Sequence, residues 1–284
     1  MILIADSGST KTDWVLINKK KIVNSFQGLG INPYYQSYEN IMEILEHDLT
    51  PKINPDEIRK IHFYGSGCST ETKCQMLSSA FEKHIKNAEI NINHDLIGAA
   101  KALFGNSEGI ACILGTGSNS CHYDGKNIIA SAVSLGFILG DEGSGSYLGK
   151  SFIINYLKEN IPVEIKELFE KEYNYNLENI LDAVYNQPKP GKFLASFTKF
   201  ISENSSNEYM KGLIYSSFRG FFSEQIRKYF KYKEAPISCV GSIAYYFQDF
   251  LKEVAHENSV EIQKIIKTPI EGLVEYHRNE EEKF

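Results

Sequence analysis

The sequence predicts an α/β protein built from two lobes of similar design. A short apolar run from Ile2 to Ala5 leads into a turn rich in glycine and hydroxyl side chains, and then into a strand from Asp13 to Ile17. The same plan returns at Ile110 to Leu114, which precede a second glycine turn and a strand from Asn119 to Tyr123. Around these copies, runs of strand length alternate with segments of helical periodicity, which is typical of α/β folds.

The elements of the first lobe follow from apolar spacing and from turn residues. Residues 18–21 form a polar hairpin tip, and residues 22–26 return as a strand. Gly105 is expected to end the last helix of the lobe, because glycine readily adopts the conformation that follows a helix. The remaining elements are a helix at 38–45, a strand at 61–64, a helix at 76–85, a strand at 88–92 and a helix at 96–104.

The second lobe begins with strands and continues as helices. Its third strand is expected at 127–131, and a glycine-dense loop at 134–145 leads into a helix that begins near Tyr147. The chain is then mostly helical to about Tyr232, with a loop at 186–191 that contains two prolines. A buried strand at 236–240 and an amphipathic helix to about His256 complete this lobe.

These elements predict three segments along the chain. Residues 1–107 form an N-terminal α/β lobe, and residues 108–270 form a C-terminal α/β lobe with a helical insertion. Residues 271–284 form a helix at the lobe junction. Hinges are expected near 106–109 and 268–272, and the charged tail at 280–283 reads as a solvated helix end.

Composition excludes several classes of function. The net charge of -6 and the scattered positive residues give no basic stripe that could follow a nucleic-acid backbone. The five cysteines have no paired CxxC spacing, which favours buried thiols in a reducing cytosol over zinc or disulfides. No stretch approaches the apolar length of a membrane span. We therefore expect a soluble cytoplasmic protein with no nucleic-acid or membrane partner.

The two glycine turns have the composition of phosphate-binding turns. Gly8 and Gly117 stand where a side chain would keep a ligand away from the backbone N–H groups. Either turn taken alone is more often a plain hairpin, but two copies that each open a strand meander favour a shared triphosphate site. Asp6 supplies the single carboxylate that Mg²⁺ needs when phosphates and water provide its other ligands.

Several motifs resemble those of a known superfamily. Residues 6–12 (DSGSTKT), 115–119 (GTGSN) and 240–242 (VGS) resemble the phosphate-1, phosphate-2 and adenosine motifs of actin-like ATPases. With Gly30-Ile31-Asn32, Asp95 and the GDEGS run at 140–144, the chain is similar to the N-acetylglucosamine kinase branch, which shares its domain with the BadF/BadG/BcrA/BcrD ATPases. The resemblance spans Ile2 to about Leu251. It implies a two-lobed actin-like ATPase (ribonuclease H-like) fold with a cleft between the lobes.

The resemblance also implies residue roles. ATP and Mg²⁺ are the expected cofactors, with Asp6 as the metal ligand and Asp95 as the catalytic base. The residues expected to bind the nucleotide are Asp6, Gly8, Ser9, Thr10, Lys11, Thr116, Gly117, Gly241 and Ser242. The residues expected to bind the sugar are Asn32, Asp95, Ser118, Asn119, Gly136 and Asp141. Human-type enzymes have a Gly-Trp-Gly motif where this chain has Ser134-Leu135-Gly136, so the sugar itself is less well defined.

Some of these residues have simpler interpretations. Asp95 could only cap the helix that follows it, since aspartate is a common N-cap. Asp141 and Glu142 could form a salt-bridged loop, and Asn32 could be an ordinary loop residue.

The predicted function is ATP-dependent phosphorylation of an amino sugar, with N-acetylglucosamine as the favoured substrate. One alternative is a BadF-type ATPase that activates a dehydratase, although no cysteine pair has an evident iron–sulfur spacing. A second alternative is a non-catalytic sugar sensor. A homodimer through the helical part of the second lobe is compatible with the sequence.

Overall fold

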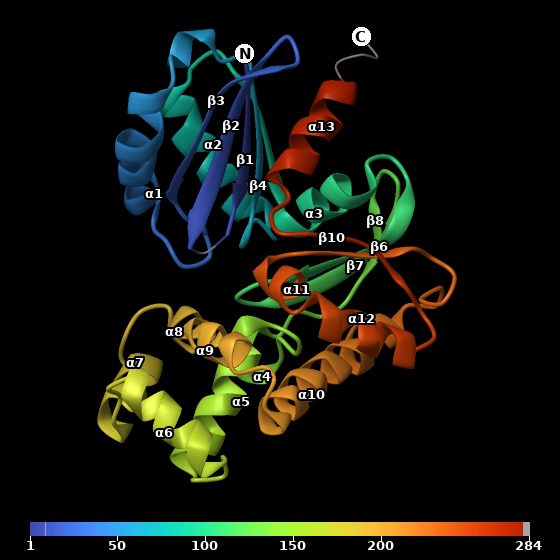
Figure 1. Ribbon diagram of the computed structural model, residues 1–284. Coiled ribbons are helices and arrows are strands. Elements are labelled where there is room, and N and C mark those ends of the chain that lie inside the picture. The colour runs from blue at the N-terminus through green and yellow to red at the C-terminus, as the bar shows by residue number, and fades with distance from the viewer. Residues whose placement is uncertain (9, 281–284) are drawn as a thin grey trace. The chain divides into compact units, whose positions relative to one another are not determined.

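The computed structural model describes residues 1–280 except Ser9, and the chain forms two compact units (Figure 1). The first unit comprises Met1–Ser107, the short segment Asp124–Ile128 and the chain from Thr268 onward. The second unit comprises Glu108–Tyr123 and Ile129–Lys267. Each unit has its own sheet and its own hydrophobic core, so each is described separately.

The first unit is built on a five-stranded sheet in the order β3-β2-β1-β4-β5. Strands β1, β2 and β3 are antiparallel neighbours, whereas β1, β4 and β5 run parallel to one another. The strands are β1 (Ile2–Ser7), β2 (Lys11–Asn18), β3 (Lys21–Leu29), β4 (Lys60–Gly65) and β5 (Glu89–His94). This mixed topology brings the carboxyl ends of the three parallel strands to one edge of the sheet.

Helices cover this sheet and bury an aromatic core. The rings of Trp14, Phe63 and Phe81 are fully buried, with ring centroids 5.6–6.2 Å apart, so Trp14 is a core residue. The helices are α1 (Tyr38–Ile44), α2 (Glu71–His84), α3 (Asp95–Phe104) and α13 (Ile270–Glu280). Short π- or 3₁₀-helical turns lie at η1 (Leu45–Leu49), η2 (Thr50–Lys52) and η3 (Pro55–Glu57). Gly105 follows α3 with a φ of 60°, as the sequence predicts.

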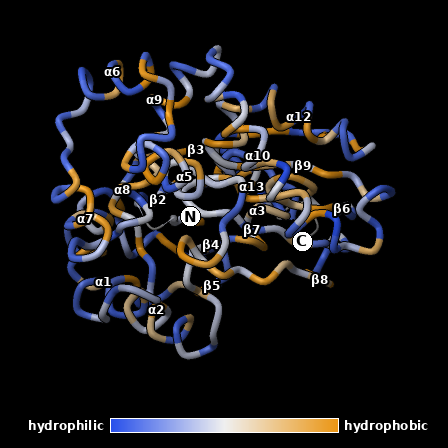
Figure 2. Tube along the Cα trace, turned by 90° about the horizontal axis from the view of Figure 1, so that it is seen from below, coloured by the Kyte–Doolittle hydropathy of each residue, from blue (hydrophilic) through white to orange (hydrophobic). Residues whose placement is uncertain are grey.

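The second unit repeats the strand order of the first. Its sheet runs β10-β9-β6-β7-β8, so the first strand in sequence is central, the next two lie on one side and the last two on the other, as in the first unit. The strands are β6 (Glu108–Leu114), β7 (Ser118–Asp124), β8 (Ile128–Ser131), β9 (Ile237–Val240) and β10 (Ile262–Ile266). Strand β9 is buried along its whole length and is drawn in hydrophobic colours in Figure 2.

The helices of the second unit enclose a core rich in phenylalanine. Phe152, Phe169 and Phe200 contact one another with ring centroids 5.0–5.5 Å apart. The helices are α4 (Gly136–Leu139), α5 (Gly145–Leu157), α6 (Val163–Glu172), α7 (Leu177–Tyr185), α8 (Pro190–Ser196), α9 (Thr198–Glu203), α10 (Glu208–Glu224), the 3₁₀ turn η4 (Ile226–Lys228), α11 (Ser242–Tyr246) and α12 (Gln248–Glu257). The break between α7 and α8 lies in the predicted loop at 186–191.

Two differences from the sequence prediction concern the last elements of the second unit. The amphipathic helix expected to run to His256 is divided at Phe247, whose φ and ψ of -108° and 25° leave the helical region while its ring is buried. Strand β10 is absent from the prediction, because its two exposed polar residues, Gln263 and Lys264, are adjacent and interrupt any apolar alternation. The hinge positions remain predictions, and residues 281–283 of the charged tail lie outside the described residues.

Among the residues that the structure describes, no helix combines the length and the apolar character needed to cross a membrane.

Candidate functional site

In the first unit, the candidate site lies at the edge where the parallel strands end. Ser7 pairs with Gly65, and Gly65 pairs with His94, so the ends of β1, β4 and β5 lie side by side. This register brings the residues around these positions together, and it explains why Asp6 and Asp95, distant in sequence, interact electrostatically. Ligands of α/β sheets commonly bind at this edge.

The Asp6 carboxyl group is in an environment that favours binding of a cation. Burial, with added repulsion from Asp95 and Asp13, raises the pKa of Asp6 to about 8, although Lys11 opposes this effect. A divalent cation beside Asp6 would offset both the repulsion and the lost hydration. The residues present therefore fit the predicted Mg²⁺ ligand.

The first glycine turn has open space beside Gly8, where a side chain would otherwise stand. The Gly8 N–H donates to the Lys11 carbonyl over 3.0 Å, and a Cβ added at Gly8 would meet nothing closer than that oxygen, at 3.9 Å. The Thr10 carbonyl accepts from the Gly30 N–H. Lys11 Nζ lies 2.7 Å from Asp13 Oδ2, so this lysine would have to leave Asp13 to reach a phosphate. The predicted role of Ser9 falls outside the described residues.

Asp95 is the first residue of α3, and its helix is capped by the residue before it. His94 is the N-cap, and its Nδ1 accepts the N–H of Leu96 over 3.1 Å. The interpretation of Asp95 as a simple cap is therefore wrong. Ser66 Oγ donates to Asp95 Oδ2 over 2.6 Å, whereas the buried Oδ1 accepts no hydrogen bond.

The His94 ring lies beside the Asp95 carboxylate. His94 Nδ1 lies 2.8 Å from Asp95 Oδ1, but a ring nitrogen that accepts from Leu96 cannot also donate to the carboxylate. Burial alone would raise the pKa of Asp95, but the adjacent His94 ring and the hydrogen bond from Ser66 outweigh it and hold the pKa below its usual value. A hydrogen bond to Asp95, which only the protonated ring can donate, raises the pKa of His94. Asp95 is thus kept ionised.

Asn32 is held in place by backbone contacts and by the end of β1. Ser7 Oγ accepts the Ile31 N–H over 2.9 Å and lies 3.0 Å from the Ile31 carbonyl. Asn32 Oδ1 accepts the Tyr34 N–H over 3.0 Å, and the residue is buried against Gly67, where a Cβ would collide with it. This loop is therefore attached to the same strand edge as Asp6 and Asp95.

Ser66 is a site residue that the sequence analysis does not identify. Ser66 follows Gly65, the last residue of β4, and Asp95 follows His94, the last residue of β5. Gly65 and His94 are register partners, so the residues that follow them lie close together. The signal was present as the Gly65-Ser66-Gly67 turn after a predicted strand. Only the strand register shows that this turn meets Asp95.

In the second unit, three predicted motifs come together around the turn between β6 and β7. The carbonyl oxygens of Gly115 and Thr116 accept the N–H groups of Gly145 and Ser146 over 2.8 and 3.0 Å. Gly241, with a φ of 128°, packs so closely on Leu114 that a Cβ would collide with its carbonyl oxygen. The GTGSN, GDEGS and VGS motifs are thus one structural cluster, with Ser242 as the first residue of α11.

Asp141 adjoins the residues predicted to contact the sugar. Its carboxylate accepts the Ser118 N–H and lies where a Cβ on Gly117 would approach Oδ2 to 2.9 Å. Burial raises the pKa of Asp141 to about 6, with Glu142 adding to the effect and the Ser118 N–H opposing it. Asn119 Oδ1 accepts the Ser120 N–H. Gly136, with a φ of 71°, has open space where a side chain would stand.

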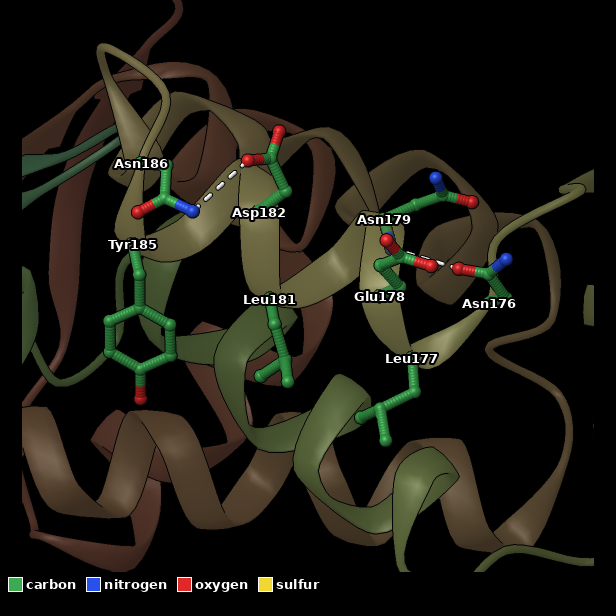
Figure 3. A pocket seen from close by; sticks show the side chains of 8 residues that line it. All are labelled: Asn176, Leu177, Glu178, Asn179, Leu181, Asp182, Tyr185 and Asn186. Atoms are coloured by element: carbon green, nitrogen blue, oxygen red, sulfur yellow. Dashed lines mark hydrogen bonds between the residues drawn. The ribbon is translucent and has the colours of Figure 1, made fainter.

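A separate surface depression of about 860 Å³ lies on α7, and Figure 3 shows the side chains that line it. Leu177, Leu181 and Tyr185 expose apolar surface there. None of the residues predicted to bind ATP or sugar lines this depression. It contributes nothing to the candidate site.

Solved structures of known proteins resemble this chain along its whole length. A candidate N-acetylglucosamine kinase from Porphyromonas gingivalis is 40% identical, with a TM-score of 0.95 over 99% of this chain and 100% of that one. A candidate N-acetylglucosamine kinase from Chromobacterium violaceum is 14% identical with a TM-score of 0.70, covering 97% of this chain and 98% of that one.

The ethanolamine utilization protein EutJ from Carboxydothermus hydrogenoformans is also similar, at 14% identity and a TM-score of 0.53, over 97% of this chain and 88% of that one. These last two likenesses concern the fold alone. No protein-family model and no curated protein matches the sequence.

Proposed function

Because this chain belongs to the N-acetylglucosamine kinase-like proteins of the BadF/BadG/BcrA/BcrD ATPase family, within the actin-like ATPases, we propose that it transfers the γ-phosphoryl group of ATP to an amino sugar. N-acetylglucosamine is the proposed substrate. The full-length similarity to a candidate N-acetylglucosamine kinase supports this choice of sugar.

The observation that carries the proposal is the arrangement of carboxylates at one edge of the first sheet. Asp6 and Asp95 come from the ends of β1 and β5 and interact electrostatically. Asp6 is destabilised as an anion in the absence of a cation, whereas Asp95 is stabilised as an anion and keeps one oxygen without a donor. Two carboxylates with opposite pKa shifts fit two different roles, namely a cation ligand and a base.

Phosphoryl transfer depends on positioning and on neutralisation of charge more than on covalent chemistry. We assign the phosphates to the open space beside Gly8, to Thr10 and Lys11, and to Thr116 and Gly117. Gly241 and Ser242 are assigned to the nucleoside. Mg²⁺, held through Asp6, would supply positive charge at the phosphate oxygens.

Asp95 is assigned as the general base. Its Oδ1 accepts the proton of the attacking sugar hydroxyl, while Ser66 keeps Oδ2 occupied and fixes the orientation of the carboxylate. The remaining sugar contacts are assigned to Asn32, Ser118, Asn119, Gly136 and Asp141, which offer amide, hydroxyl, backbone and carboxylate groups for sugar hydroxyls.

A coupled assay of ADP release tests the proposal with N-acetylglucosamine, glucosamine, N-acetylmuramic acid and glucose. We expect turnover that depends on an amino sugar. Asp95→Asn should reduce it by about 10²- to 10⁴-fold, the usual contribution of a positioned base, while ATP binding persists. Asp56→Asn, which changes an exposed carboxylate of the same unit, is the matched control and should behave like the parent.

The alternatives predict other results. ATP turnover that no sugar stimulates would favour the dehydratase activator, and binding of ATP and sugar without turnover would favour the sensor. Parental turnover in Asp95→Asn would remove this residue from the mechanism.

A further inference from the structure

A buried chain of hydrogen bonds in the second unit ends at Ser118. Tyr229 and Ser120 are joined through their hydroxyl oxygens over 2.9 Å, and Ser120 Oγ lies 3.0 Å from Gln225 Oε1. Gln225 Nε2 in turn lies 3.0 Å from Ser118 Oγ. Each of these four side chains belongs to a residue that is at most 6% exposed. The chain is therefore shielded from water, where an unmade hydrogen bond is costly.

The direction of the protons along this chain is given by the orientation of the Gln225 amide, with Oε1 towards Ser120 and Nε2 towards Ser118. The Tyr229 hydroxyl accepts the Ala132 N–H over 2.9 Å, so its own proton is available for Ser120. Ser120 then donates to Gln225 Oε1, which leaves the Gln225 amide group facing Ser118 as a donor. The opposite orientation of the amide would reverse the chain, with Ser120 donating to Tyr229, and would leave the buried Tyr229 proton without an acceptor in the chain.

This direction determines which hydrogen bonds the Ser118 hydroxyl can still make. Its oxygen is occupied as an acceptor from Gln225, and its proton is not used by the chain. The backbone N–H of the same residue is already donated to Asp141. Ser118 can thus donate a proton to a ligand, and the Asp141 carboxylate beside it can accept one.

We propose that Gln225 is a positioning residue that fixes Ser118 as a hydrogen-bond donor to an oxygen of the sugar. The inference rests on the proposed function, since it concerns how the same site recognises its substrate. A sugar hydroxyl matches the pair well, because it accepts from Ser118 while it donates to Asp141. An ammonium group at this position, which only donates, does not match.

The test uses a substitution that inverts the hydrogen-bonding character of residue 225 with little change in shape. In Gln225→Glu, the ionised carboxylate accepts the Ser118 proton and takes it away from the sugar. We expect the sugar KM to rise about 3- to 10-fold, the worth of one hydrogen bond, with kcat and the ATP KM unchanged. As the pH is lowered and the carboxyl group is protonated, it can again accept from Ser120 and donate to Ser118. The sugar KM should then return towards the parental value.

Three further variants separate positioning from a general structural effect. Gln225→Met removes both bonds and should raise the sugar KM without the pH dependence. In a Ser118→Ala background, Gln225→Met should add nothing, because it acts through Ser118. Asn258→Leu is the matched control: this residue of the same unit is 7% exposed and its amide also makes two hydrogen bonds, to Arg227 and Val254, so it should lose stability without a change in sugar KM.

The proposal is overturned if Gln225→Met raises the sugar KM no more than Asn258→Leu, or if its effect persists in Ser118→Ala. If Gln225→Glu does not fold, these two comparisons decide the question. If Gln225→Glu folds, a sugar KM that stays parental at every pH also overturns it. A parent that binds sugar by calorimetry but does not phosphorylate it refutes the proposed kinase function, and the same variants are then compared by sugar Kd. A parent that neither binds nor phosphorylates any sugar overturns both proposals.

Discussion

At the scale of single residues, the protonation state of His94 determines whether the Oδ1 atom of Asp95 is free to act as a base. The neutral ring accepts from Leu96 and leaves Asp95 Oδ1 free, whereas the protonated ring would donate to that oxygen. The hydrogen bond to Asp95 raises the pKa of His94, so protonation extends to higher pH than for an ordinary histidine.

This arrangement predicts a pH dependence of catalysis. The kcat/KM for sugar should increase as the pH rises through the raised pKa of His94, because deprotonation releases Oδ1. In His94→Asn, which retains an N-cap but does not titrate, this rise should disappear from the profile. Profiles of kcat/KM against pH for the two proteins provide the measurement, and superimposable curves would contradict the role of His94.

At the scale of elements, the turn between β6 and β7 depends on a glycine from a distant strand end. Gly241 follows β9 with a φ of 128°, and its backbone lies directly against Leu114 and Gly115. A side chain there meets both an unfavourable conformation and a collision.

Gly241→Ala is therefore expected to destabilise the second unit by about 3 kcal/mol. Gly212→Ala is the matched control: this glycine is exposed in the interior of α10, and an added Cβ meets nothing within 4 Å. That substitution should stabilise the protein by about 1 kcal/mol, since alanine favours the helix. Urea unfolding followed by circular dichroism gives both values, and equal midpoints would refute the close approach at Gly241.

The sequence was informative about elements and less so about the contacts between them. Both glycine turns, the strands beside them and the loop at 186–191 follow from local signals, and the α/β fold of the actin-like class is confirmed. The division at Phe247 depends on how its ring is buried. Ser66 depends on strand register, and Gln225 depends on a side-chain contact across more than a hundred residues. These features are tertiary, so no local pattern encodes them, and the assigned ligand roles remain predictions.

For the molecule as a whole, acid stability should depend on two stacked histidines in the first unit. The rings of His62 and His277 have centroids 3.8 Å apart, and His277 Nε2 lies 2.9 Å from the Tyr64 hydroxyl. Burial, with neighbouring positive charges adding to it, lowers the pKa of His62 to about 4 and that of His277 to about 2. Below a pH of about 6.5 the unfolded chain therefore binds protons that the folded unit excludes.

The free energy of unfolding should accordingly fall as the pH is lowered from about 6.5 to 4. His277→Gln should reduce this slope by about the amount that one bound proton contributes. His47→Gln, at an exposed position, should leave the slope unchanged. Urea unfolding at each pH, followed by the fluorescence of Trp14, measures the first unit, because this only tryptophan of the sequence is buried in its core. A slope unchanged in His277→Gln would contradict the prediction.

The first unit is completed by the helix that follows all other described elements in the chain. Helix α13 packs on α3, β1 and β2, and Gly272 lies against the backbone of Ala102. During translation, the first unit therefore stays incomplete until α13 has been made, after every other element of both units. Until synthesis of α13, the apolar surface of α3 is open to chaperones, so nascent chains stalled before Ile270 should remain sensitive to protease in their N-terminal part.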